Sequence, residues 1–391
     1  MKAISGFSGA WLVVVAASLL AAAMPRGARA ADEISAHDSD RKTIALEILV
    51  IEGETPTDSV AAHQLDRLIG RAAANFKGAV LGESESDKAR RFFSSVDRAL
   101  IESDVIVPPS GDIDFLREGL RPHALSLAEF SRAQSRFANF RRLPEMRANQ
   151  TAGGSFYFFD CDLASIVYAA VAECLGFPVY LVEIPNHTFV RWQSGAVVLN
   201  WDPNDGISYS DDYYTRTWHV PVSTGVWPRY FENLSRDQVL STWLVLCGRD
   251  KKARGDFSGA STDFRKAVEK NPNDFGAVNE LAWLLATCPA KELRSGKEAL
   301  SLAQANVGRS RRSVWLQTLG AAQAEVGDFK AAIRSEDEAR RSASTPLGWV
   351  SPHETLIDCN FCLAAYRHGR TFADATAAED RARLKDNHPA R

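Results

Sequence analysis

Three side chains with complementary chemistry follow one another in the middle of this chain. Cys161 supplies a thiol, His187 an imidazole and Asp202 a carboxylate. Together they are the parts of a nucleophilic triad, in which a thiolate attacks a carbonyl carbon, the imidazole moves protons, and the carboxylate orients the imidazole. A serine nucleophile is disfavoured because no serine stands in a G-x-S-x-G elbow.

The segment around Cys161 predicts a helix that presents the thiol at its first residue. Asp160 is a typical N-cap residue, and Gly176 is typical of the position after Leu175, where the apolar run ends. The positive end of the helix dipole favours a thiolate at Cys161, whereas the charges of Asp160 and Asp162 oppose it. A buried structural cysteine is the alternative interpretation of Cys161 alone.

The chain after this helix predicts an antiparallel sheet, and the whole is an α+β arrangement. Segments rich in β-branched and aromatic residues, separated by Pro-Asn and Ser-Gly, predict strands at 177–184, 188–192 and 196–201. Alternation along a strand places His187, Phe189 and Arg191 on one face. Asp202 ends the neighbouring strand, where its carboxylate could fix the imidazole tautomer of His187.

The triad predicts acyl transfer through a covalent intermediate. Attack of Cys161 on a carboxamide or peptide carbonyl gives an acyl-enzyme, which water or an amine resolves while His187 shuttles protons. The oxyanion requires the backbone N–H of Cys161 and one donor that precedes it in the chain. Gln150 and Tyr157 are the candidates for this donor.

The run Phe159–Gly206 resembles the core of the bacterial transglutaminase-like superfamily, cysteine-dependent proteins with a papain-like fold. That family places its nucleophile at a helix start, its histidine on the next strand and its acidic residue on the strand after. Cys161, His187 and Asp202 match these positions one by one. The matching segments are the helix-to-strand turn at 172–179 and the histidine strand at 185–192.

Two departures from the family pattern concern the nucleophile. Asp160 stands where many members have glycine, and no tryptophan directly follows Cys161. The superfamily includes proteases, amide-modifying enzymes and proteins without catalysis. The resemblance therefore implies a site, and it leaves the substrate open.

The C-terminal part of the chain matches tetratricopeptide repeats, which a branch of the same family carries behind its core. Small residues at fixed spacing let paired helices approach closely, and stacked pairs bury faces that one pair cannot cover. Turns are expected at Gly255-Asp256 and Gly327-Asp328, with a longer turn in the middle repeat. The signature positions are Gly248, Ala260, Phe264, Ala267, Ala299, Ala303, Gly320, Ala332 and Ala339.

The N-terminus predicts export. Lys2 precedes an apolar stretch from Trp11 to Ala23, which is too short to cross a bilayer, and Ala28-Arg29-Ala30 fits a small-x-small cleavage site. We expect a periplasmic or secreted protein without stable membrane insertion after cleavage. The expected organisation is a signal peptide at 1–30, a linker at 31–40, a transglutaminase-like domain at 41–240, and a repeat domain with capping helices at 241–391.

The bulk composition is that of a globular protein with a core. The chain has 391 residues, of which 45% are hydrophobic and 24% charged, and a net charge of -3. This charge argues against a nucleic-acid-binding surface, which usually carries a clustered basic excess. A protein or peptide bound by the repeats is the expected partner.

The remaining cysteines predict no cofactor. Cys174 lies on the same predicted helix as Cys161 and too far along it for a disulfide. Cys359 and Cys362 have a spacing compatible with zinc or a redox pair, and helix packing is the interpretation that we favour. The acidic loop after Asp202 lacks the order of a calcium-binding loop.

Two hypotheses follow. In the first, the chain is an exported thiol hydrolase or acyl transferase that acts on protein or peptide amides, with the repeats presenting the substrate or binding a partner. In the second, the fold is kept without catalysis and the chain is a repeat scaffold. A reactive Cys161 separates the first from the second, because fold analogy alone does not establish activity.

Overall fold

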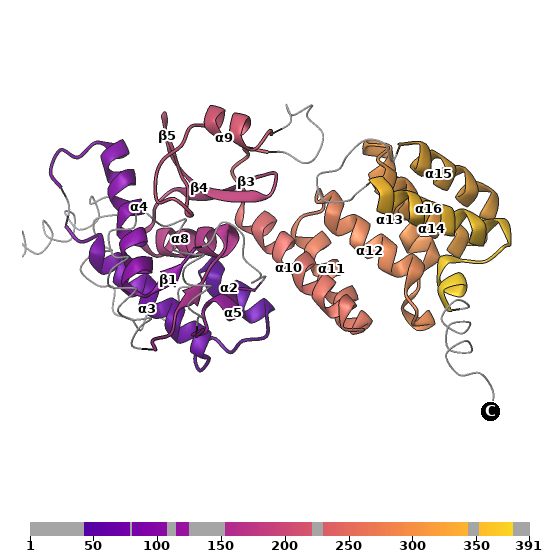
Figure 1. Cartoon of the computed structure of the whole chain (residues 1–391), viewed down its shortest axis with the longest axis horizontal. Coiled ribbons are helices and arrows are strands. Elements are labelled where there is room, and N and C mark those ends of the chain that lie inside the picture. The colour runs from indigo at the N-terminus through magenta and orange to yellow at the C-terminus, as the bar shows by residue number, and fades with distance from the viewer. Residues whose placement is uncertain are drawn as a thin grey trace, which may run out of the picture. The chain divides into compact units, whose positions relative to one another are not determined.

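A computed structural model of the chain describes residues 43–78, 80–107, 115–124, 153–220, 230–342 and 352–377, which are mostly helical with a small share of sheet (Figure 1). The chain forms two compact units. Unit 1 contains the chain up to Val182 together with His187–Tyr214, and unit 2 contains Glu183–Asn186 and everything from Thr215 onward. The boundary after Tyr214 thus precedes the one expected from sequence at residue 240.

Most helices of unit 1 begin at a residue whose side chain caps them. The N-caps Thr43, Ser59 and Ser84 each accept a hydrogen bond from a backbone N–H of the first turn. The helices are α2 (Ile44–Ile51), α3 (Val60–Asn75), α4 (Glu85–Glu102), α5 (Leu116–Gly119) and α8 (Cys161–Leu175).

Helix α8 is the centre of unit 1, and both of its predicted ends are confirmed. The Asp160 carboxylate accepts from the Leu163 N–H at 2.8 Å, and Gly176 adopts a left-handed conformation with φ of 70°. Helices α2, α3 and α4 and strand β4 (His187–Ser194) all pack against it. Because α8 is buried almost all round, the position of Cys161 at its start is fixed by the core.

The sheet beside α8 has three strands in the order β3-β4-β5, with β3 at Val179–Ile184 and β5 at Val197–Trp201. Strands β4 and β5 are antiparallel, with pairs running from Val190↔Trp201 to Ser194↔Val197. The three strands agree with the sequence analysis to within a few residues at their ends. A second sheet, in which β1 (Val105–Ile106) pairs in parallel with β2 (Tyr157–Phe158), was not predicted.

Aromatic side chains fill both faces of β4. On the face toward α4, Trp192 lies 5.9 Å from Phe92 between ring centroids, and Trp201 of β5 stacks on Phe93 at 5.3 Å. On the opposite face Phe189 stacks on Tyr214 of α9 (Asp211–Thr217). The start of β4 is therefore enclosed on both sides, and its side chains have little freedom to move.

Unit 2 is built from helices that pack on their neighbours in sequence. In addition, α10 packs on α12, α12 on α14 and α14 on α16. The first helices of successive pairs therefore also contact one another. The elements are α10 (Arg236–Ala253), α11 (Phe257–Lys270), α12 (Phe275–Thr287), η2 (Lys291–Leu293), α13 (Gly296–Arg309), α14 (Ser313–Glu325), α15 (Phe329–Ser342) and α16 (Pro352–Arg367).

Small residues allow the close approach of paired helices in unit 2, as their spacing predicts. A Cβ atom added to Gly248 of α10 would lie 2.5 Å from the ring of Phe264 in α11. The two expected turns are present, with φ of 82° at Gly255 and 87° at Gly327. Positive φ at both positions is a conformation that glycine adopts without a steric cost.

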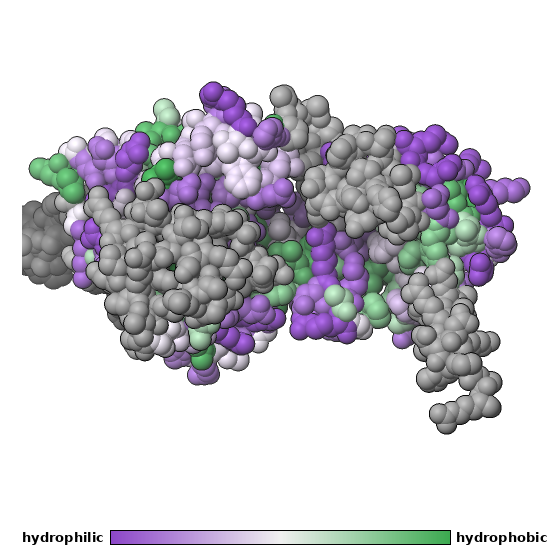
Figure 2. Space-filling model, in the orientation of Figure 1, coloured by the Kyte–Doolittle hydropathy of each residue, from purple (hydrophilic) through white to green (hydrophobic). Residues whose placement is uncertain are grey.

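Several predictions fall on residues outside the described ranges. These are the export signal and linker at 1–40, and Gln150. Among the helices that the structure describes, none combines the length and hydrophobicity needed to cross a membrane. On the surface visible in Figure 2, hydrophobic residues form small patches among hydrophilic ones.

Candidate functional site

His187 and Asp202 form a buried pair at the edge of the sheet, as the sequence predicted. His187 Nε2 lies 2.7 Å from Asp202 Oδ2, and their side chains are 1% and 6% exposed. The carboxylate can only accept, so the imidazole donates from Nε2. This hydrogen bond selects one tautomer and leaves Nδ1 as the ring nitrogen that can exchange a proton with a nucleophile.

The Asp202 carboxylate is held at both oxygens. Oδ1 accepts from the Asn204 backbone N–H at 2.9 Å, and Oδ2 accepts from the Tyr214 hydroxyl at 3.1 Å as well as from His187. The main chain of Asp202 is also fixed, because its N–H donates to the Ile207 carbonyl at 2.9 Å. The carboxylate is thus oriented before any ligand arrives.

Cys161 reaches the same strand from the start of α8. Its thiol accepts a hydrogen bond from the Thr188 backbone, next to His187, and it feels the charge of Asp202. Cys161 itself is partly exposed, whereas Thr188 and His187 are buried. The structure therefore brings the three predicted residues to one end of β4, with the sulfur against its backbone.

The surroundings of Cys161 disfavour a thiolate. Burial and the charges of Asp162, Asp160 and Asp202 raise the pKa of the thiol well above its ordinary value, and the Thr188 hydrogen bond opposes this rise. The thiol is accordingly protonated in the resting site, so its proton must leave during the attack on a substrate.

Asp162 is a second carboxylate of this site, which the sequence indicated only as a charge near Cys161. Its pKa is raised by burial, although a hydrogen bond from the Thr188 side chain and the proximity of His187 lower it. One residue, Thr188, therefore contacts Asp162 with its hydroxyl and Cys161 with its main chain. The sequence feature that could have identified Asp162 as a site residue is its position immediately after Cys161.

Tyr157, one of the two oxyanion candidates, lies on β2. Its backbone N–H donates to the Asp104 carbonyl at 3.1 Å and is not available to an oxyanion. The hydroxyl of Tyr157 is therefore the group that could donate to the oxyanion, and this role stays a prediction. The Thr188 N–H, which points at the sulfur of Cys161, is a further donor that sequence reasoning missed.

Asp97 of α4 supports the site from behind. Its carboxylate accepts from the Tyr168 hydroxyl of α8 and from Trp201 Nε1 at 3.1 Å. Burial raises the pKa of Asp97 to about 7, and the hydrogen bonds from Tyr168 and Trp201 oppose this rise. Since Trp201 directly precedes Asp202, Asp97 ties the end of β5 to the helix that carries Cys161.

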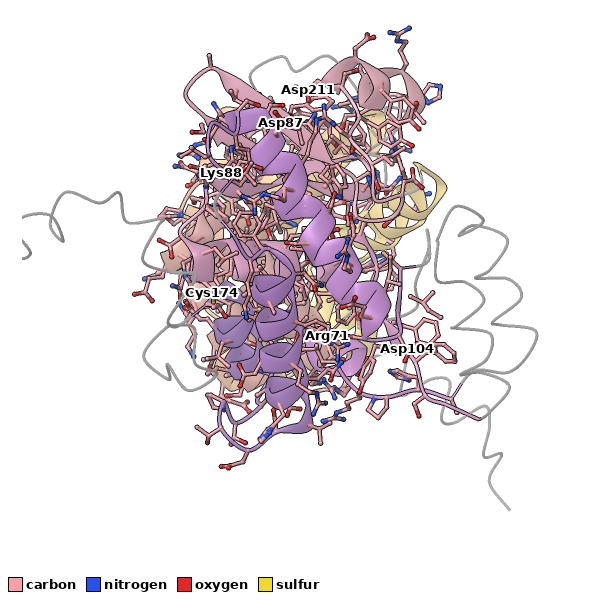
Figure 3. All side chains as sticks on the ribbon, turned by 90° about the vertical axis from the view of Figure 1, so that its left-hand side faces the viewer. Arg71, Asp87, Lys88, Asp104, Cys174 and Asp211 are labelled. Carbon is pink, nitrogen blue, oxygen red and sulfur yellow. The ribbon has the colours of Figure 1, made fainter. Side chains whose placement is uncertain are left out.

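A polar network anchors α9 on the other face of the sheet. Asp211 Oδ1 accepts from Arg191 Nη2 and from Asn200 Nδ2, both at 2.7 Å, and Arg191 Nε donates to Asn200 Oδ1 at 2.7 Å. Figure 3 shows Asp211 near the top of the view, with Cys174 lower down on the left. Arg191 shares the face of His187, as strand alternation predicted.

The other cysteines do not join this site. Cys161, Cys174, Cys359 and Cys362 are not part of disulfides, and Cys359 and Cys362 are buried in α16. No cluster of three or more His, Cys, Asp or Glu side chains suited to a metal ion occurs in the described ranges. Cys362 packs with Tyr366 in the core between α14, α15 and α16, and Cys359 is buried one turn before it on the same helix.

Comparisons with known protein families, curated proteins and solved structures gave no match to this chain.

Proposed function

We propose that this chain is an exported thiol-dependent hydrolase or acyl transferase that acts on protein or peptide amides. The observation that carries the proposal is the buried 2.7 Å contact between His187 and Asp202 beside the thiol of Cys161. A histidine oriented by a carboxylate and adjacent to a thiol at a helix start is the arrangement that activates a cysteine nucleophile. The transglutaminase-like resemblance of this segment agrees with it.

The reaction begins from a neutral thiol. The Cys161 proton passes to His187 as the sulfur bonds to the carbonyl carbon, and the amine leaves with the proton that His187 returns. Water or a second amine then attacks the thioester, giving a carboxylic acid or a new amide and restoring the Cys161 thiol. Asp202 remains a carboxylate and stabilises the imidazolium in between.

The paired helices of unit 2 support a role in binding a protein or peptide. Their sequential packing, and the glycine at the Gly248–Phe264 contact, fit a tetratricopeptide-repeat array, whose surfaces bind extended segments of other proteins. We infer that this unit presents a substrate or docks a partner.

Acylation by a small activated ester tests the proposal. The full chain is incubated with p-nitrophenyl acetate, and mass spectrometry locates the acetyl group. We expect the adduct on Cys161 and its loss in Cys161→Ala, whereas Cys174→Ala, which removes another partly exposed thiol, should keep it. An adduct distributed over the other cysteines, with Cys161 unmodified, would sink the proposal.

The alternative of a non-catalytic scaffold is favoured by one observation. Burial and the three carboxylates of Asp162, Asp160 and Asp202 raise the pKa of the Cys161 thiol and suppress its nucleophilic form. A scaffold would show no acylation of Cys161, and Cys161→Ala would leave its binding of partners unchanged.

A further inference from the structure

The hydroxyl of Tyr214 donates a hydrogen bond to the same carboxylate oxygen of Asp202 that accepts from His187. It lies 3.1 Å from Asp202 Oδ2, and His187 Nε2 lies 2.7 Å from the same atom. Two donors thus share one oxygen, whereas Oδ1 of Asp202 accepts from the Asn204 backbone. Nothing in the sequence around Tyr214 distinguishes it from the neighbouring tyrosines.

The position of Tyr214 is fixed by packing on every side. The side chain is fully buried, and its ring lies parallel to that of Phe189 with centroids 4.2 Å apart. The His187 ring lies 6.0 Å away at 36°. Asp211, in the preceding turn of α9, is bound by Arg191 of β4, so the backbone that carries Tyr214 is tied to the same strand as His187.

We propose that Tyr214 is a positioning residue for His187, which acts through Asp202 by fixing the orientation of Oδ2 and by sharing its negative charge. The inference rests on the proposed function of the Cys161 site. A donor to Oδ2 restricts rotation of the carboxylate, so the imidazole that donates to the same oxygen keeps its orientation. It also weakens the attraction between Asp202 and an imidazolium, which makes His187 release its proton more readily to a leaving amine.

The chemistry of Tyr214 fits a permanent donor. Burial and the neighbouring Asp202 raise the pKa of its hydroxyl far above the ordinary value. The hydroxyl therefore keeps its proton whenever the protein is folded, and it serves neither as a base nor as a proton relay. Among the titratable groups near this pair, Asp162 acts on His187, whereas Tyr209 and Asp205 act on Tyr214. Asp202 contacts both His187 and the Tyr214 hydroxyl.

Tyr214→Phe tests this role because it removes the hydroxyl and keeps the stacked ring. The first readout is the titration of the His187 imidazole, followed by NMR on the full chain with labelled histidine. We expect its midpoint to move upward by about half a pH unit or more. Without the Tyr214 hydroxyl as a donor, the Asp202 carboxylate attracts the imidazolium more strongly. The second readout is acetylation of Cys161, which should slow about tenfold across the pH range as the imidazole loses its orientation.

Tyr209→Phe is the matched control. Tyr209 belongs to the same tyrosine cluster, at 5.9 Å from Tyr214, and its hydroxyl lies 2.9 Å from Asp205 Oδ2. Its removal should leave the His187 midpoint where it is. An unchanged or lowered midpoint in Tyr214→Phe overturns the inference, whether or not Cys161 reacts. A raised midpoint with no acetylation of the unmodified chain supports the positioning role and refutes the proposed catalysis.

Discussion

Replacement of Asp97 by asparagine should change how the stability of unit 1 depends on pH. The carboxyl is buried between α4, α8 and β5, where it accepts hydrogen bonds from the Tyr168 hydroxyl and the Trp201 indole. Its pKa is about 7 in the folded chain and 3.8 when the group is in water. The folded chain therefore binds the proton more tightly than the unfolded chain does.

The sign and size of the effect follow from this difference. Below pH 4 Asp97 is protonated in the folded and the unfolded chain, so its ionisation does not change the free energy of unfolding. Between pH 4 and pH 7 the unfolded chain alone loses the proton, which stabilises the unfolded state. Stability therefore falls as the pH rises through this window. The rise from 3.8 to about 7 corresponds to about 4 kcal/mol, which is an upper value for this group.

Urea unfolding of the full chain, followed by near-ultraviolet circular dichroism, measures this effect. The difference in unfolding free energy between Asp97→Asn and the unmodified chain should grow by up to about 4 kcal/mol from pH 4 to pH 8, in favour of the variant. The exposed Asp58, replaced in the same way, serves as the control and should give a difference that does not vary with pH. A constant difference for Asp97→Asn would refute the burial of its charge.

Two further predictions concern packing and thiol reactivity. Gly248→Ala should destabilise unit 2 by about 1–3 kcal/mol because its methyl group would enter the ring of Phe264, while Gly308→Ala, with open space around it, should be neutral or slightly stabilising in thermal unfolding. Asp162→Asn should speed the alkylation of Cys161 by iodoacetamide near pH 8, since it removes a negative charge that raises the pKa of the thiol. Equal alkylation rates would show that this carboxylate does not act on the sulfur.

The parts of the site that the sequence predicted depend on local signals. Asp160 and Gly176 define the two ends of α8, and their cap geometry requires no contact with residues distant in the chain. The pairing of His187 with Asp202 follows from strands that alternate and are joined by a short turn. Residues close in the chain determine such features, so sequence patterns predict them.

The groups that the sequence did not predict act over long distances in the chain. Asp97 meets Tyr168 and Trp201 only because α4, α8 and β5 pack together, and no pattern near residue 97 marks it. Tyr214 reaches Asp202 because α9 folds back over β4. Helix α2 likewise packs on α8, from which it is more than a hundred residues away in the chain.

The most direct test of the site compares the acetylation of Cys161 in the unmodified chain and in His187→Asn. General base catalysis by a positioned histidine contributes about 10²- to 10⁴-fold, so the variant should lose a factor of about 100 or more in rate. His368→Asn, which alters an exposed histidine in unit 2, should keep the full rate. Equal rates in the unmodified chain and in His187→Asn would contradict the account, because Cys161 would then react without the help of the pair beside it.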